Sequence, residues 1–283
     1  MTDLEPVAVL GTGALGGVVA RAFAAAGHAT TAWNRSPQRL ADLVAADPAV
    51  RPADTPVAAV ADATVVVLAV VDEAAVHDLL DRLGDAIAGA IVVNLTSTTP
   101  ETTRALAARV GEGYLDGAVM SGTRQVGDAA ALFLYAGDPA TFAAAEPVLR
   151  ALGTARHVGA DPGAASLWDT ALLAVILGAV AGFHHAAALV GAPAARMAEV
   201  AVGHLPFVAG VLTQHAEQID AGRYPVDDGS VAVFAGAVDQ LTATSVARGV
   251  ATDLPDALRA VLDRAITAGH GDEGLASVAE VLR

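Results

Sequence analysis

The stretch Val7-Ala8-Val9-Leu10-Gly11-Thr12-Gly13-Ala14-Leu15-Gly16 decides the fold. Four apolar residues, which read as a buried strand, run directly into a G-x-G-x-x-G turn, and the Ala-rich sequence behind it predicts a helix over Leu15–Ala26. Gly11 allows the tight turn, Gly13 lets the backbone approach a pyrophosphate, and Gly16 lets helix and strand pack closely. The helix N-terminus then faces the phosphate charge. In this context we favour a dinucleotide site made of Gly11, Thr12, Gly13, Ala14, Leu15 and Gly16 over a plain tight turn.

The sequence beyond this turn repeats the alternation of strand and helix. Runs such as Val65-Val66-Val67-Leu68 are continuously apolar, which indicates a parallel sheet covered on both faces. Such a series predicts an α/β fold, an N-terminal Rossmann doubly wound parallel sheet. The predicted strands are Val7–Leu10, Ala29–Trp33, Val65–Val70, Ile91–Asn94, Tyr114–Val119 and Ala131–Ala136, and the predicted helices include Pro37–Ala45, Glu73–Leu83 and Pro100–Val110.

The loop after the second strand selects the cofactor. An enzyme that uses NAD carries an acid there, which binds the ribose 2′-hydroxyl, but this chain has Asn34-Arg35-Ser36, with Arg39 further on. Guanidinium groups, a hydroxyl and a helix start favour a 2′-phosphate, so we predict NADPH. The alternative is a solvated basic turn.

Two further strand ends complete the predicted cofactor set. Ala69 and Val70 end the strand Val65–Val70, and Asn94 lies just past the end of the strand Ile91–Asn94, at the edge where ligands bind in open α/β sheets. Asn94 can orient the nicotinamide or the substrate amine. An Asn that only makes a turn is the competing interpretation.

The pattern changes at Asp161-Pro162, where Asp161 can cap a helix and Pro162 can open it. No strong breaker follows before Gly191, so the helix would be about 43 Å long. Its middle is apolar around the whole circumference, which requires burial on every side, and a second copy of the chain can provide that burial. We therefore divide the chain into a cofactor domain, 1–161, a long interdomain helix, 162–191, and a C-terminal all-α domain, 192–283.

Composition excludes several classes of function. The 283 residues have a formal net charge of −15, which argues against a nucleic-acid partner. The chain has no Cys, and its 16 basic residues are all Arg. Disulfides, thiolate chemistry and a catalytic Lys are therefore excluded. The uncharged segment from Thr170 to Phe183 is shorter than a membrane span, and no secretory signal is visible. We expect a cytoplasmic protein with no membrane and no nucleic acid as partner.

Several further segments carry a resemblance to a known family. Together with the Gly-rich turn and Trp33-Asn34-Arg35-Ser36, the chain contains Val93-Asn94-Leu95-Thr96-Ser97-Thr98-Thr99-Pro100, Leu115-Asp116-Gly117-Ala118-Val119-Met120, Gly159-Ala160-Asp161-Pro162-Gly163, Asp169-Thr170-Ala171-Leu172-Leu173, Gln218-Ile219-Asp220-Ala221-Gly222 and Gly269-His270-Gly271. Over nearly its whole length the chain resembles the imine reductase and reductive aminase family, a branch of the β-hydroxyacid dehydrogenase-like superfamily.

The resemblance implies a domain-swapped homodimer with a site between one subunit's Rossmann domain and its partner's helices. It also implies that Asp169 occupies the family's acidic or phenolic position, and that the second position, a Tyr in some members, is Leu177 here. Where the family usually has a Pro after Met120, this chain has Ser121-Gly122 instead. The substrate pocket expected from the resemblance and from nearby apolar residues comprises Met120, Ser121, Leu173, Leu177, His204, Phe207 and Phe234. For the two Phe residues, core packing is an equal alternative.

The predicted reaction is the NADPH-dependent reduction of imines or iminium ions, with cyclic imines as the expected substrates. Asp169 can donate a proton or stabilise an iminium by its charge, and its apolar surroundings should raise its pKa. A helix-surface Asp is the alternative interpretation. His184 and His185 are adjacent and point to different sides, so we predict no metal.

Two other functions stay open. One is a β-hydroxyacid dehydrogenase-like reductase of another small carbonyl substrate, although that enzyme uses a Lys that this chain lacks. The other is a non-catalytic NADPH-binding protein.

Overall fold

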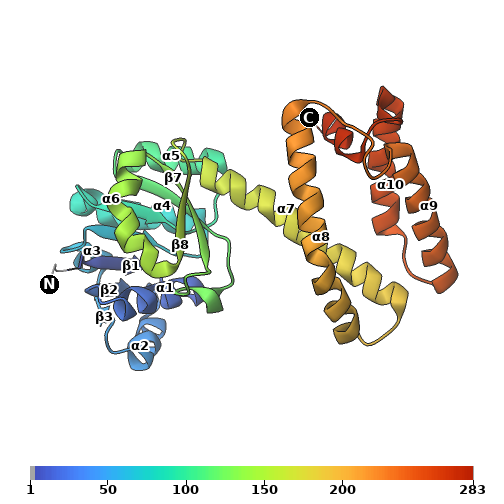
Figure 1. The fold of residues 1–283 in the computed structure, drawn as a ribbon. Coiled ribbons are helices and arrows are strands. Elements are labelled where there is room, and N and C mark those ends of the chain that lie inside the picture. The colour runs from blue at the N-terminus through green and yellow to red at the C-terminus, as the bar shows by residue number, and fades with distance from the viewer. Residues whose placement is uncertain (1–3, 283) are drawn as a thin grey trace. The chain divides into compact units, whose positions relative to one another are not determined.

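The computed structural model describes residues 4–282, which form two compact units that divide between Leu173 and Ala174. The first unit is a sheet covered on both faces by helices, and the second consists of helices (Figure 1). The predicted α/β class, with a Rossmann unit followed by an all-α unit, is confirmed. The division into 1–161, 162–191 and 192–283 stays a prediction.

Eight strands among the described residues form one sheet in the order β3-β2-β1-β4-β5-β6-β7-β8. The order reverses at β1, which pairs with β2 on one side and β4 on the other, so a crevice for ligands lies at the carboxyl end of β1. The strands are β1 (Val7–Leu10), β2 (Thr30–Trp33), β3 (Arg51–Pro52), β4 (Val65–Leu68), β5 (Ile91–Asn94), β6 (Tyr114–Val119), β7 (Leu132–Gly137) and β8 (Thr154–Gly159).

The sheet is parallel except at one pair, β6 and β7, which are antiparallel. Among the described strands this pair is the one departure from the predicted doubly wound parallel sheet. A parallel connection needs a crossover, usually a helix. The link from β6 to β7 holds only the short 3-10 turn Thr123–Gln125, so the chain turns back.

Helices cover both faces because side chains alternate along each strand. Val7 and Val9 join a core with α1 and α6, whereas Ala8 and Leu10 join a core with α3, α4 and α5 on the other face. Polar caps begin several of these helices: Thr55, Asp72, Thr99 and Asp138 each accept a hydrogen bond from a first-turn N–H. The α-helices are α1 (Ala14–Ala25), α2 (Pro37–Ala46), α3 (Pro56–Val60), α4 (Glu73–Leu83), α5 (Pro100–Val110) and α6 (Pro139–Leu149).

The long helix α7 (Ala164–Val190) begins in the first unit and ends in the second. The second unit also contains α8 (Ala194–Ala221), α9 (Val231–Arg248) and α10 (Asp253–Ala265), followed by the shorter helical turns Ile266–His270 and Leu275–Val281. Its small core joins Val231 and Ala235 of α9 to Leu262 and Ala265 of α10.

Candidate active site

A cavity of about 630 Å³ lies at the carboxyl end of β1, where the strand order reverses. The Gly-rich turn, the loop after β2, the end of β4 and the helix α4 line it. Most of the predicted cofactor residues come together here, namely Gly11, Gly13, Ala14, Leu15, Asn34, Arg35, Ser36, Arg39, Ala69 and Val70. Thr12, Gly16 and Asn94 are not among the residues that line this cavity.

The three glycines of the turn have the environments that a dinucleotide site requires. A Cβ on Gly11, whose φ is +102°, would lie 2.2 Å from the Ala69 carbonyl oxygen, and a Cβ on Gly16 would lie 1.9 Å from that of Gly11. These two glycines are fixed by turn geometry and packing. A Cβ on Gly13 would have no atom within 4 Å, so the backbone at the start of α1 is open to a ligand. The turn therefore fits the pyrophosphate of a dinucleotide.

Asn34 ties the Gly-rich turn to the basic loop. Its Oδ1 accepts a hydrogen bond from the Thr12 backbone N–H at 3.0 Å, and its Nδ2 donates to the Ser36 carbonyl oxygen at 3.1 Å. Arg35, Ser36 and Arg39 are exposed beside this clamp. They are available to bind a 2′-phosphate, and the loop has no acid to oppose one.

A buried polar network lies at the carboxyl end of β5 and beside it in the middle of β6. Asn94 is fully buried and Asp116 is 2% exposed. The Asn94 amide makes a turn, because its Oδ1 accepts from the Thr96 N–H at 3.1 Å and its Nδ2 donates to the Thr96 carbonyl. The same Nδ2 lies 3.5 Å from Asp116 Oδ1. In this structure the Asn94 side chain thus serves the turn, and its predicted contact with cofactor or substrate stays a prediction.

The network continues to the first turn of α7. Asp116 Oδ2 accepts hydrogen bonds from the Ser166 hydroxyl at 2.6 Å and from the Ser166 N–H at 3.1 Å. Burial raises the pKa of Asp116 to about 6, although the bonds from Ser166 and Asn94 favour the charged form. The negative charge of Asp169 adds to the upward shift.

A second link holds the start of α7 at the surface. The Arg104 guanidinium donates to both carboxylate oxygens of Asp161, at 3.0 Å through Nε and 2.7 Å through Nη2. These bonds hold the pKa of Asp161 below its ordinary value. Asp161 also accepts the Gly163 N–H at 3.1 Å, so the predicted helix-starting acid shapes the chain just before α7.

Asp169, the predicted catalytic residue, lies one turn beyond Ser166 on α7 and is half-buried. Burial raises its pKa, in the direction that the sequence predicts. Trp168, immediately before it, is half exposed. The carboxyl group therefore combines partial access with a raised proton affinity, which suits an acid or a charged partner for a substrate cation.

The predicted substrate residues fall in both units. Met120 and Ser121 follow β6, and the Ser121 Oγ accepts the Leu132 N–H at 2.9 Å, so this hydroxyl closes the turn between β6 and β7. Leu173, Leu177, His204 and Phe207 are exposed on α7 and α8, and Phe234 is half-buried on α9. His204 stacks on Phe207, with ring centroids 5.0 Å apart. Whether these residues share one pocket stays a prediction.

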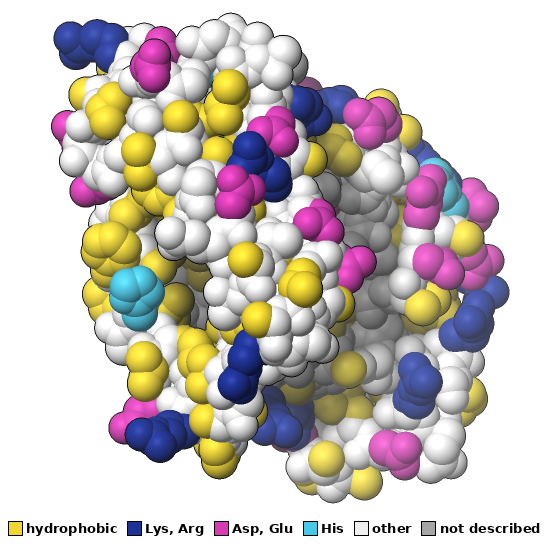
Figure 2. Space-filling model, turned by 90° about the vertical axis from the view of Figure 1, so that its right-hand side faces the viewer, with side chains coloured by type: hydrophobic (Ala, Val, Ile, Leu, Met, Phe, Trp, Pro, Cys, Tyr) yellow, Lys and Arg dark blue, Asp and Glu magenta, His cyan; other side chains and the backbone are white. Residues whose placement is uncertain are grey.

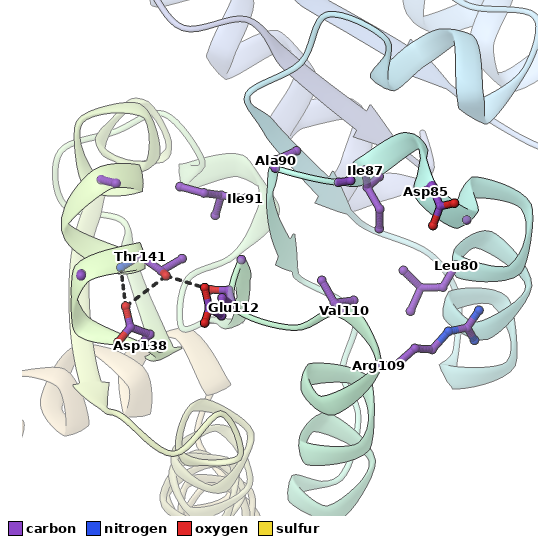
Figure 3. A pocket seen from close by; sticks show the side chains of 16 residues that line it. Leu80, Asp85, Ile87, Ala90, Ile91, Arg109, Val110, Glu112, Asp138 and Thr141 are labelled. Atoms are coloured by element: carbon purple, nitrogen blue, oxygen red, sulfur yellow. Dashed lines mark hydrogen bonds between the residues drawn. The ribbon is translucent and has the colours of Figure 1, made fainter.

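Another cavity, of about 770 Å³, lies near the amino ends of β5 and β6, away from the carboxyl end of β1 (Figure 3). Three of its lining residues bind one another: Asp138 Oδ1 accepts from the N–H and hydroxyl of Thr141, and the Thr141 hydroxyl also lies 3.0 Å from the Glu112 carbonyl. It contains none of the predicted site residues. The described residues contain no cluster of His, Asp or Glu that could hold a metal ion.

Two family models match successive parts of the chain. Residues 6–159 match the family described as the NAD binding domain of 6-phosphogluconate dehydrogenase, and residues 161–283 match the NADPH-dependent reductive aminase-like C-terminal domain. A reductive aminase from Aspergillus terreus, solved in complex with NADPH and ethyl levulinate, is 32% identical with a TM-score of 0.90, and the match covers 99% of each chain. The chain belongs to the imine reductase and reductive aminase family.

Two other members of this family are similar over their full length. An imine reductase from Aspergillus terreus, solved with NADPH4 and dibenz[c,e]azepine, is 31% identical with a TM-score of 0.90, covering 99% of this chain and 100% of that one. An NADPH-dependent reductive aminase from Aspergillus oryzae is 28% identical over 98% of this chain and 97% of its own length. These relatives confirm the predicted family, the oxidoreductase class and NADPH as the cofactor.

Sequence reasoning assigned no role to Asp116 or Ser166. A signal existed for Asp116, because an acid inside the apolar strand Tyr114–Val119 must be paired when the strand is buried. Ser166 gave no comparable signal. A small hydroxyl residue in the first turn of an Ala-rich helix is ordinary, and only the fold places it against β6.

Proposed function

We propose that the chain reduces imines and iminium ions to amines with NADPH, that small cyclic imines are its substrate class, and that Asp169 protonates the nitrogen or stabilises its positive charge. The observation that carries this proposal is Asp169 itself. It is a half-buried carboxyl group of raised pKa on α7, in a chain that has no Lys or Cys to act instead. The A. terreus relative whose structure contains dibenz[c,e]azepine supports the substrate class.

Different residues of the chain would bind different parts of the cofactor. The open backbone at Gly13 and the start of α1 would hold the pyrophosphate, and Arg35, Ser36 and Arg39 would hold the 2′-phosphate. When bound, NADPH supplies the hydride that reduces the carbon of the C=N bond. The remaining requirement is a proton and a stabilised positive charge at nitrogen.

Asp169 can meet that requirement in two ways. As the acid it gives its proton to the substrate nitrogen, and as the carboxylate it stabilises an iminium cation by charge. Partial burial strengthens both, because it keeps the proton on the acid to a higher pH and lowers the screening of the charge. The lack of a Lys argues against the alternative reductase of small hydroxy- or oxo-acids, which uses one as its acid.

We also propose that the active form is a homodimer in which a second copy covers the apolar helices, as in the domain-swapped arrangement expected from the sequence. Among the described residues, α7 and α8 are long and apolar enough to cross a membrane. Ile176 and Leu177 of α7 and Phe207 of α8 are more than half exposed in the single chain. Figure 2 shows hydrophobic side chains at the surface, gathered along the left of that view.

A partner chain explains these helices better than lipid does. Within α7 the carboxyl group of Asp169 and the imidazoles of His184 and His185 interrupt the apolar sequence, and α8 contains Arg196 and Glu199. Charged groups facing lipid are costly. We place the protein in the cytoplasm, because a chain without Cys needs no oxidising compartment.

Oxidation of NADPH by a panel of small cyclic imines tests the proposed function. The matched controls are 2-oxo and 3-oxo acids of similar size. We expect turnover with one or more imines and none with the acids. Turnover of the acids alone would contradict the proposal and indicate a β-hydroxyacid dehydrogenase-like activity. NADPH binding without any turnover would indicate a non-catalytic protein.

A further inference from the structure

We infer that Asp116 is a positioning residue for the reaction: through Asn94 and Ser166 it fixes the turn after β5 and the first turn of α7, and so it sets the place of Asp169. This inference rests on the proposed function, in which Asp169 meets the substrate. Asp116 itself is buried under these elements and reaches no substrate directly.

The Asp116 carboxylate accepts hydrogen bonds, and the groups around it are donors. Oδ1 faces the Asn94 amide at 3.5 Å, and Oδ2 accepts both the hydroxyl and the N–H of Ser166. Every neighbour in these contacts is a donor. A carboxylate can accept on both oxygens, whereas an Asn side chain at this position would offer one oxygen and turn an NH₂ group toward one of the donors.

The hydroxyl groups around Ser166 are ordered in one direction as a result. Because the Ser166 hydroxyl donates to Asp116, the Thr103 hydroxyl, 3.0 Å away, must donate to Ser166. Thr98, whose Oγ1 lies 2.8 Å from that of Thr103, must then donate to Thr103. The ionised Asp116 therefore orients a chain of hydroxyls that joins the loop after β5, the helix α5 and the start of α7.

This network positions Asp169 because of helix geometry. Asp169 follows Ser166 by three residues, so the two side chains lie on the same side of α7, one turn apart. The groups around Asp116 are Asn94 on β5, Tyr114 on its own strand, and Ser166 and Asp169 on α7, and among the described residues only Asp169 shifts its pKa by charge. The negative charge of Asp169 therefore makes a small contribution to the raised pKa of Asp116.

The pH dependence follows from the acceptor role. Below about pH 6, Asp116 gains a proton and presents an O–H to neighbours that are themselves donors, so one hydrogen bond of the network is lost. Turnover should therefore fall as the pH drops through this value. If Asp116 had only a structural role, its protonation would lower the stability of the protein but would not produce a step in the pH profile of turnover.

The test compares Asp116→Asn with the wild type and with Asp138→Asn, an exposed acid of the same unit that lies outside the network. Turnover is measured against pH with a permanently charged N-alkyl iminium, whose own ionisation adds no step. NADPH affinity is measured by fluorescence titration. The carboxyl groups are titrated by ¹³C NMR in the protein without cofactor, which makes one readout independent of activity.

We expect Asp116→Asn to lower kcat by up to about 100-fold, the loss that a misplacement of about 1 Å can cause. NADPH affinity should stay within about threefold of wild type. The step near pH 6 should vanish from both the kinetic and the NMR titration, and in Asp169→Asn the NMR step should move to lower pH because the neighbouring negative charge is gone. Asp138→Asn should keep both steps.

Two results would overturn the inference: unchanged kcat in Asp116→Asn, or a loss of kcat that only parallels losses in stability and NADPH affinity. If Asp116→Asn does not fold, Ser166→Ala tests the inference instead, since it keeps the buried charge and removes one hydrogen-bond donor. Ser166→Ala should lower kcat and raise the pKa of Asp116, whereas Ser166→Thr, which keeps the hydroxyl, should retain kcat. A wild type that turns over no imine but shows the NMR step refutes the proposed function and not the buried network of Asp116.

Discussion

The two compact units differ in how much of their own apolar surface one chain can bury. In the first unit, two large cores pack against opposite faces of one sheet, and Leu106, Phe133 and Tyr135 are fully buried. In the second unit, the core joins α9 and α10, while α7 and α8 present exposed Leu, Ile and Val side chains. When one chain buries the apolar surface of a unit by itself, the sequence of that chain is sufficient to predict the unit. When apolar helices stay exposed, as in the second unit, they indicate a partner.

Asp169 lies near the end of the first unit, which buries its own core, and replacing it tests the catalytic role of the carboxyl group at that boundary. We expect Asp169→Ala to lower kcat by about 10²–10⁴-fold, the contribution of a positioned acid or base, with NADPH binding nearly intact. Asp169→Asn should also be slow on a neutral imine. Steady-state kinetics with NADPH titration measures both, and full activity of both variants would move the role to another group, with His204 next to test.

A permanently charged iminium separates the two roles of Asp169. This substrate needs no proton before it accepts hydride. If Asp169 acts mainly as the proton donor, Asp169→Asn should recover much of its rate on the iminium. If it acts mainly by charge, the variant should stay slow.

Ile176→Asp tests whether the second unit is completed by a second copy. Ile176 is 55% exposed in the single chain, and an unpaired charge buried at an interface costs several kcal/mol. The dimer should therefore weaken by about a thousandfold, as measured by sedimentation. Val57→Asp, at an exposed position of α3 in the first unit, is the matched control and should leave the assembly unchanged. A wild type that is a stable monomer at micromolar concentration would contradict the proposal.

Leu106→Ala measures the self-contained core directly. Leu106 is fully buried between α5 and the sheet, so the cavity should cost about 2–5 kcal/mol of the free energy of unfolding. This loss should not depend on protein concentration in denaturant titrations. By contrast, Leu177→Ala on α7 should show a loss that shrinks on dilution, because in the proposed homodimer the partner supplies its packing. Equal concentration dependence in both variants would remove the distinction between the units.

Arg35→Ala should have the smallest effect of this series. The loss of a charge-assisted hydrogen bond to a 2′-phosphate costs about 1.5–3 kcal/mol, or about 10–100-fold in NADPH affinity. NADH affinity should change little, since NADH has no such phosphate. Fluorescence titration with both cofactors gives the ratio. Equal affinity of the wild-type protein for NADPH and NADH would show that the loop after β2 does not select the cofactor.

The sequence predicted those elements whose own residues determine them. The strands Val7–Leu10, Ile91–Asn94 and Tyr114–Val119 and the helices Glu73–Leu83 and Pro100–Val110 have the predicted bounds, because apolar runs and polar caps define them locally. The strands β3 and β8 were missed: β3 has two residues, one a Pro, and β8 mixes Arg156 and His157 with small residues. Their pairing is decided by the neighbouring strand.

In the candidate site, too, the sequence predicted the parts that local residues determine and missed the part that depends on distant residues. The cofactor cavity was predictable because Gly11 to Gly16 and Asn34 to Arg39 each act within a short segment. The network of Asp116 was not, because its partners lie 22 and 50 positions away along the chain. The register between β5 and β6 sets Asn94 beside Asp116, and the packing of the first turn of α7 brings Ser166 to the same carboxylate.

The two edges of the sheet have a consequence for aggregation. An open edge presents unpaired backbone groups on which another chain can add a strand and begin a fibril. At one edge, β3 is two residues long and its Pro52 has no N–H to offer. At the other, β8 carries the exposed Arg156, and its pairing with β7 is interrupted by a register shift. Neither edge is a good template for cross-β growth, so two copies of this sheet should not pair edge to edge.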